Sequence, residues 1–247
     1  MEGIDSDPIF GEPLANYPSD RTRPLIIAGV VCALVSVLLN FTLAQVPNWW
    51  GPVSTIVIMA LLVLVCAWYL LHLWNREIVL YARGFSYREG SNTVFFFYEE
   101  IRSIRLRAER LAYFGGLIRR SIYRFTVTTR QDESFTITNL YLRADELGTK
   151  LTDQINRILE PDIAHRLEAG EKVAFGDTLT LDMDGLKEGS RTLVWAEYGG
   201  YRLGNHRLSL LDRAGAVWYS LPIPEVDNIT LLLERLRQRQ SVNKPTS

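Results

Sequence analysis

The chain has 247 residues, of which 47% are hydrophobic, and a formal net charge of −1. This nearly neutral average conceals three regions, because residues 1–23 carry a net charge of −3, residues 75–130 carry +6 and residues 131–247 carry −4. The two cysteines, Cys32 and Cys66, both lie in apolar runs, so the rest of the sequence excludes a disulfide framework and a cysteine-based metal site.

The first segment, residues 1–23, is rich in proline and acidic residues. Such a composition is typical of disorder, so we expect a disordered tail over residues 1–23 and a second short one over residues 241–247. The apolar run that follows the first tail is longer than the core of about 7–15 residues in a secretory signal peptide. We therefore expect this run to be retained in the mature protein.

Two uncharged apolar runs come next, Leu25–Val46 and Val53–Trp74, with six residues between them. Each has 22 residues, and a helix needs about 20 residues to cross a hydrocarbon layer of about 30 Å. Neither run contains Asp, Glu, Lys or Arg, each of which costs roughly 2.5–3.5 kcal/mol at the centre of a bilayer. The sequence therefore predicts a transmembrane helical hairpin over residues 24–75.

The residues around this hairpin predict its orientation. Arg21 and Arg76 flank its outer ends, whereas the connector carries no charge. Because basic residues favour the cytoplasmic side, we expect both termini to be cytoplasmic and the chain to be a multi-pass membrane protein. We also expect Trp49, Trp50 and Trp74 to lie at the membrane interface, where tryptophan is enriched.

After the hairpin, short runs rich in aromatic and β-branched residues alternate with tight turns, a pattern typical of antiparallel strands. The expected strands are Glu77–Leu80, Phe85–Tyr87, Thr93–Tyr98, Ile101–Leu106, Tyr123–Thr129 and Ser134–Asn139. From Asp145 the apolar residues recur at helical spacing, and we expect this helix to end at Pro161.

The same order of elements begins again about 100 residues later. Arg83-Gly84-Phe85 has a counterpart in Asp184-Gly185-Leu186, and the turn at residues 88–93 has one at residues 187–192. We therefore expect two domains, residues 76–160 and 161–240, each with a bent antiparallel sheet of about seven strands and a C-terminal helix. The fold class is α+β, and this architecture is that of pleckstrin-homology-like (PH-like) domains.

Several of these segments resemble a bacterial membrane-anchored family of unknown function with tandem PH-like domains. They are Arg83–Ile101, Phe135–Asn139 and Gly170–Gly176. A strand-ending pattern W-x-E-I of that family is similar to Trp195–Tyr198 in the second copy, whereas the first copy has Tyr98 in place of tryptophan. The resemblance implies the fold and a place in a bacterial inner membrane, and it implies no activity.

Catalytic and metal-binding patterns are absent from the sequence. The three histidines are not paired with other ligand residues at metal-binding spacing, and there is no phosphate loop or nucleophile elbow. Asp182-Met183-Asp184-Gly185 imitates the start of a calcium loop but lacks the later ligands, and the sequon at Asn228 lies in a predicted cytoplasmic helix. We expect no catalytic residue, no cofactor, no metal and no enzymatic function.

The basic region after the hairpin contains eleven arginines and no lysine. We hypothesise that four of them contact anionic lipid headgroups, since a basic residue near an anionic membrane surface contributes about 1 kcal/mol. These four are Arg105, Arg107, Arg119 and Arg120. The alternative is a solvated strand face on which these arginines pair with neighbouring glutamates.

Two functions remain open. The first is a membrane-anchored, non-enzymatic interaction or scaffold module whose PH-like domains bind protein partners or a second copy of the chain. The second is a regulatory module that binds anionic lipid through the arginines of the first domain. Nucleic acid is disfavoured as a partner because residues 131–247 are acidic.

Overall fold

The computed structural model describes residues 8–43, 50–113, 118–204 and 206–243. The chain forms two compact units. The first contains Met1–Phe96 and Leu140–Leu142, and the second contains Phe97–Asn139 and Arg143–Ser247. The expected domain boundary between residues 160 and 161 falls within a helix of the second unit.

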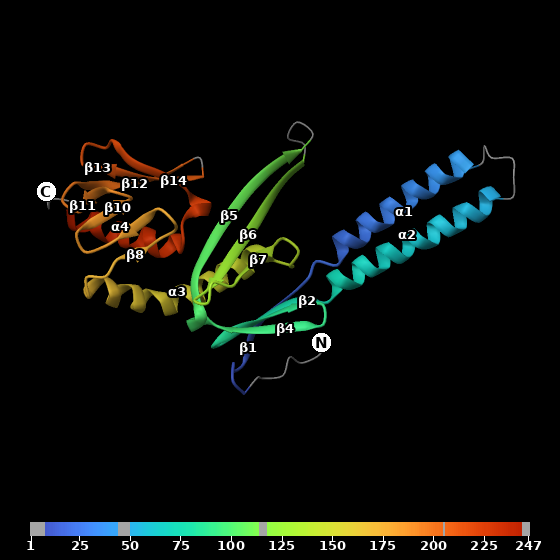
Figure 1. The fold of residues 1–247 in the computed structure, drawn as a ribbon, viewed down its shortest axis with the longest axis horizontal. Helices are drawn as coiled ribbons and strands as arrows, with labels where there is room; N and C mark the ends of the chain where they lie inside the picture. The colour runs from blue at the N-terminus through green and yellow to red at the C-terminus, as the bar shows by residue number, and fades with distance from the viewer. Residues whose placement is uncertain (1–7, 44–49, 114–117, 205, 244–247) are drawn as a thin grey trace. The chain divides into compact units, whose positions relative to one another are not determined.

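Among its described residues, the first unit combines two helices with a four-stranded antiparallel sheet of order β1-β2-β3-β4 (Figure 1). Its elements are β1 Pro13–Pro18, α1 Thr22–Leu43, α2 Trp50–Trp74, β2 Arg76–Tyr81, β3 Gly84–Glu89 and β4 Asn92–Phe97. The core of the sheet includes the fully buried side chains of Tyr17, Ile78, Leu80 and Phe85.

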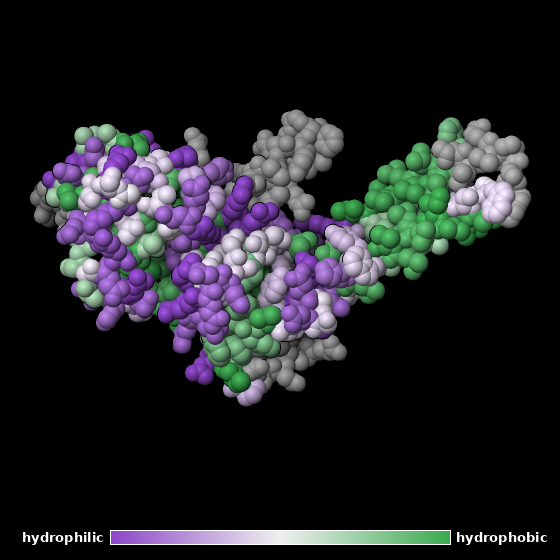
Figure 2. Space-filling view, viewed as in Figure 1, coloured by the Kyte–Doolittle hydropathy of each residue, from purple (hydrophilic) through white to green (hydrophobic). Residues whose placement is uncertain are grey.

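The helices α1 and α2 run side by side, and both are long and apolar enough to cross a membrane. The Sγ atoms of Cys32 on α1 and Cys66 on α2 lie 4.0 Å apart. Almost none of the apolar side chains of the two helices is buried within the protein, and Figure 2 shows the resulting apolar surface. The expected pair of apolar helices is confirmed, and residues 44–49 of the expected hairpin lie outside the described residues.

The expected disorder before the hairpin is wrong for Pro13–Pro18, which form the edge strand β1. Pro13 is paired with Tyr81 and Pro18 with Glu77, so β1 runs antiparallel to β2. Proline is tolerated in an edge strand because one side of that strand makes no ladder hydrogen bonds. Because β1 precedes the hairpin and β2 follows it, the two apolar helices are inserted between neighbouring strands of one sheet.

Among its described residues, the second unit contains two three-stranded sheets, one four-stranded sheet, two α-helices and two single-turn helices. Its first elements are the single-turn helix η1 Tyr98–Glu100, the strands β5 Ile101–Tyr113, β6 Ile118–Thr129 and β7 Ser134–Thr138, and the helix α3 Ala144–Glu168. The strands that follow are β8 Val173–Ala174, β9 Leu179–Leu181, β10 Gly185–Glu188, β11 Arg191–Val194, β12 Tyr198–Gly204, β13 Arg207–Asp212 and β14 Val217–Pro222. A single-turn helix η3, Ile223–Glu225, and the helix α4, Ile229–Asn243, complete the unit.

The helix α3 continues past Pro161, where the sequence predicts its end. The buried side chains of Leu159 and Ile163 lie on either side of this proline, and both belong to the apolar core. Their burial offsets the backbone hydrogen bond that a proline removes from a helix interior. Tertiary packing therefore extends α3 to Glu168.

The order of elements is the same in both halves of the described chain. A four-stranded sheet precedes a three-stranded sheet and a helix, as β1–β7 and α3 in the first copy and as β8–β14 and α4 in the second. Gly84 and Gly185 open equivalent strands, and a Cβ atom would lie 2.2 Å from the Phe96 carbonyl oxygen in one copy and 2.1 Å from that of Leu193 in the other. Both positions therefore require glycine for the same reason, the close approach of a neighbouring backbone.

Candidate functional site

The four arginines expected to bind lipid lie on two paired strands. Arg105 and Arg107 are on β5, and Arg119 and Arg120 are on β6. The side chains of Arg119 and Arg120 lie outside the described part of the chain. The side chain of Arg107 is exposed on β5, and that of Arg105 is partly buried.

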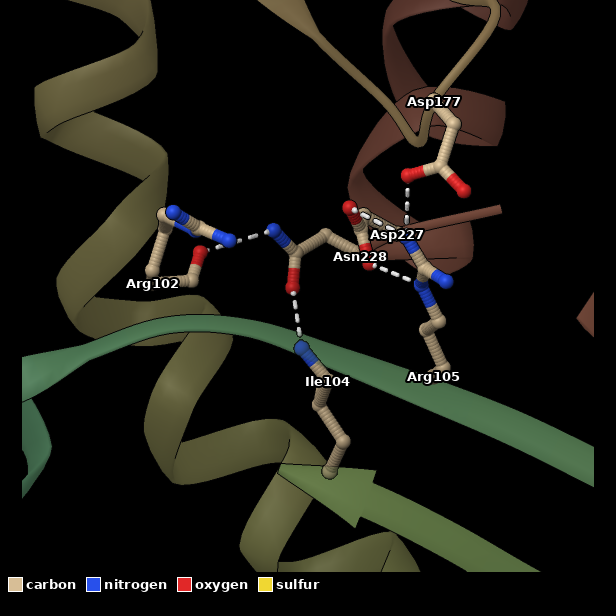
Figure 3. A network of polar contacts seen from close by, with 6 residues as sticks. All are labelled: Arg102, Ile104, Arg105, Asp177, Asp227 and Asn228. Atoms are coloured by element: carbon tan, nitrogen blue, oxygen red, sulfur yellow. Dashed lines mark hydrogen bonds and ion pairs between the residues drawn. The ribbon is translucent and has the colours of Figure 1, made fainter. Parts of the chain in front are cut away.

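Arg105 is held by two carboxylates of the second copy (Figure 3). Its Nε–H donates to Oδ1 of Asp227 at 2.6 Å, and its Nη2 donates to Oδ1 of Asp177 at 3.0 Å. The hydrogen bond to Asp227 raises the pKa of the Arg105 guanidinium above its usual value. This side chain is bound within the second unit, which argues against its expected role as a headgroup ligand.

Asn228 joins the beginning of α4 to the edge of β5 (Figure 3). Its side-chain Oδ1 accepts the N–H of Ile104 at 2.9 Å, and its own N–H donates to the Ile104 carbonyl at 3.0 Å. Its Nδ2 donates to the carbonyl of Arg102 at 3.3 Å. Asn228 has a φ of +49°, in the left-handed region that asparagine tolerates better than most residues. One residue thus satisfies three backbone groups of an otherwise open strand edge.

A cleft of about 560 Å³ opens next to this network, within the second unit. Its charged lining residues are Arg102, Arg105, Arg130, Arg166 and Lys172, with Asp162, Asp177 and Asp227. Its apolar lining residues are Leu159, Ile163, Val173 and Ala174. The cleft is bordered by β5, the second half of α3 and the segment around β8, and it has more cations than carboxylates.

Sequence reasoning identified only one side of this cleft. The basic strand pattern indicates Arg105, but nothing in it indicates that Arg130, Arg166 or Lys172 lies nearby. These residues come from β6–β7, α3 and β8 regions that are separated along the chain. The arginine-rich stretch indicates a basic surface, but it does not predict which distant residues its side chains contact.

Asp182, at the start of the motif that imitates a calcium loop, organises a β-turn between β9 and β10. Its Oδ1 accepts the N–H groups of Asp184 and Gly185, both at 3.0 Å, and its other oxygen pairs with Lys187. Burial raises the pKa of this carboxyl group, but the Lys187 ammonium and the two N–H donors outweigh burial and hold the pKa below its usual value. Within the described residues, no cluster of three or more His, Cys, Asp and Glu could hold a metal ion.

The tryptophans expected at the membrane interface mark the two ends of α2. Trp50 is its first residue and Trp74 its last, and both side chains are exposed. The guanidinium of Arg21 lies 4.7 Å from the ring centroid of Trp74, in a cation–π contact beside the beginning of α1. Trp49 lies outside the described residues.

These features define a class of protein in which two paired apolar helices interrupt a mixed α+β fold of antiparallel sheets. The model of a family of unknown function, DUF6585, matches residues 5–245, which is nearly the whole chain. The chain therefore belongs to this family, and the expected membership of a family of unknown function is confirmed. No curated protein matches the chain.

Proposed function

We propose that the chain is an integral membrane protein whose α1–α2 hairpin anchors a non-enzymatic protein-binding module. The exposed apolar surface of the hairpin supports the anchor, with Phe41 73% exposed and Trp68 70% exposed. Exposure of an apolar surface of this extent to water is unfavourable, whereas contact with the hydrocarbon chains of lipids is favourable. The observation that carries the proposal is the place of these helices between the paired strands β1 and β2.

The pairing of β1 with β2 supports a location of both flanking segments on one side of the membrane. β1 ends just before α1, and β2 begins directly after α2, with Pro18 opposite Glu77. Strands that share backbone hydrogen bonds cannot lie on opposite sides of a bilayer. Since Arg21, Arg23 and Arg76 cluster at these ends of the helices, the proposed side is the cytoplasmic one.

We further propose that each copy is a PH-like domain and that the module binds proteins through a sheet edge. The repeated order of a four-stranded sheet, a three-stranded sheet and a helix supports the PH-like assignment. The edge strand β4 exposes Val94 and Phe95, at 39% and 42%. An edge strand can accept an extended segment of another chain by adding backbone hydrogen bonds, and exposed apolar side chains add contact area.

Lipid binding by the four arginines is the weaker of the two functions. Arg105 is paired with Asp177 and Asp227, so its use at a membrane would require breaking both contacts. This cost leaves protein binding as the function that we propose.

Cysteine labelling tests the topology. In a variant without native cysteines, Leu14→Cys reports on β1 and Val217→Cys on β14, and both positions are exposed. We expect a membrane-impermeant maleimide to label both cysteines only after the cytoplasmic face is opened. Labelling of the two cysteines from opposite sides would contradict the proposal.

Site-specific crosslinking tests protein binding. A photo-reactive amino acid at Val94 on β4 should yield discrete protein adducts in cells, and these should disappear when Thr93→Pro removes a backbone donor from the same strand. The matched control is the same amino acid at the exposed Val217 on β14. Adducts to lipid alone, or equal adducts from both positions, would contradict the proposal.

A further inference from the structure

We propose that the cleft beside Arg105 binds a phosphorylated small molecule or a phosphate-bearing headgroup, because its lining combines more cations than carboxylates with an apolar wall. The inference goes beyond the proposed function and does not depend on it, since the whole cleft lies within the second unit. Its volume, about 560 Å³, falls in the range of about 300–1,000 Å³ that is usual for small-molecule sites.

The charge balance of the cleft favours an anion. Its lining contains five cations and three carboxylates, and Arg105 is paired with two of these carboxylates, Asp177 and Asp227. The third, Asp162, has an oxygen 4.0 Å from Nη2 of Arg130, at the outer limit of an ion pair. The excess positive charge therefore belongs to the cations other than Arg105.

These cations are available to a ligand. Arg102 pairs with Asp132 and Arg166 with Glu171, but both carboxylates are well exposed, at 73% and 57% of their side-chain surface. Exposed ion pairs contribute only about 0–1 kcal/mol, so a more highly charged anion can displace them. Among the described residues, no ion pair or side-chain hydrogen bond holds the ammonium group of Lys172.

The shape of the cleft favours a phosphorylated organic molecule over a bare ion. Leu159, Ile163 and Val173 form an apolar part of its wall, against which a carbon skeleton can pack. Arginine presents a planar fork of N–H donors that matches the oxygens of a phosphate group. The contacts of Asn228 and Arg105 hold β5 against the beginning of α4 and so keep one wall in place without a ligand.

The test uses the full chain in phosphatidylcholine nanodiscs and titrates inorganic pyrophosphate by calorimetry. We expect saturable binding, weakened about tenfold or more in the double variant Arg130→Gln/Lys172→Gln, because each charge-assisted contact is among the stronger hydrogen bonds. The matched control, Lys150→Gln/Arg207→Gln, removes the same charge at exposed positions outside the cleft and should bind as the unmodified chain does.

A gain of affinity provides a second readout that misfolding would not mimic. Asp162→Asn removes the one lining carboxylate that Arg105 does not pair with, so we expect it to bind pyrophosphate several-fold more tightly. Absence of saturable binding by the unmodified chain, equal weakening in the control double variant, or no gain in Asp162→Asn would overturn the proposal.

A lipid arm distinguishes the two sources of phosphate. Nanodiscs that contain phosphatidic acid are compared with nanodiscs that contain phosphatidylglycerol at the same surface charge. Weaker pyrophosphate binding with phosphatidic acid alone would support the site and assign it to a headgroup. Equal binding in both would support the site and assign it to a soluble phosphorylated molecule.

Discussion

The most direct test of how the two copies are joined is the substitution Asn228→Ala. It removes the side-chain acceptor of the Ile104 N–H group, 2.9 Å away, and the donor to the Arg102 carbonyl, 3.3 Å away. Ile104 is 3% exposed, so water cannot replace the lost acceptor without rearrangement. The backbone hydrogen bond from Asn228 to Ile104 is independent of the side chain and would remain.

The expected loss of stability is the sum of three unequal effects. A buried N–H group without a partner costs about 1–3 kcal/mol, and the longer bond to a carbonyl contributes about 0.5–1.5 kcal/mol. Alanine at the observed φ of +49° adds about 1 kcal/mol. We therefore expect Asn228→Ala to destabilise the second unit by about 2.5–5.5 kcal/mol, which is large compared with the usual effect of a single substitution.

Hydrogen exchange of peptides that cover residues 101–107 measures this effect at the site itself. We expect Asn228→Ala to accelerate exchange of the Ile104 amide strongly, and Asn228→Asp to accelerate it less, because aspartate keeps the acceptor oxygen. Asn228→Gly relieves the backbone conformation and isolates the loss of the side chain. Unchanged exchange of the Ile104 amide in Asn228→Ala would refute the reasoning.

Three further predictions follow from packing, proximity and charge. Gly148→Ala should destabilise the protein by about 1–3 kcal/mol in a denaturant titration, because the alanine Cβ would lie 1.8 Å from the ring of Phe125 on β6. This loss should exceed the gain from the better helix propensity of alanine, and an increase in stability would contradict the packing. Oxidation with a membrane-permeant copper complex should form a disulfide between Cys32 and Cys66 of one chain. When a protease site introduced between α1 and α2 is cleaved, the two fragments should then stay joined until a reductant is added. Cys66→Ser is the control, and its fragments should separate. The pKa of Asp182 is lower in the folded protein than in the unfolded chain, so its contribution to stability is complete above its ordinary pKa and is lost as the pH falls through the folded value. The free energy of unfolding of Asp182→Asn should therefore depend less on pH in this acidic range than that of the unmodified chain. Lys187→Gln should reduce the pH dependence by a smaller amount, because it removes only one of the groups that lower this pKa.

Part of the candidate site could be predicted from the sequence. The arginine-rich stretch of residues 75–130 predicts an anionic ligand around β5, and the structure has a cleft there whose lining contains more cations than carboxylates. The role of Arg105 could not be predicted, because its partners Asp177 and Asp227 lie 72 and 122 residues further along the chain. Asn228 was equally hidden, since its hydrogen bonds reach β5 across 124 residues.

Local features of the sequence by themselves determined the two apolar helices and the repeated order of strands and helix. Uncharged runs of sufficient length predict the apolar helices, and short runs between glycine-containing turns predict the strands. Both patterns are local, so they do not depend on contacts with distant residues. Tertiary structure alone decided that Pro13–Pro18 form a strand and that α3 continues past Pro161. In both places the local sequence favours another conformation, and burial against partners from distant segments supplies the free energy that overrides it.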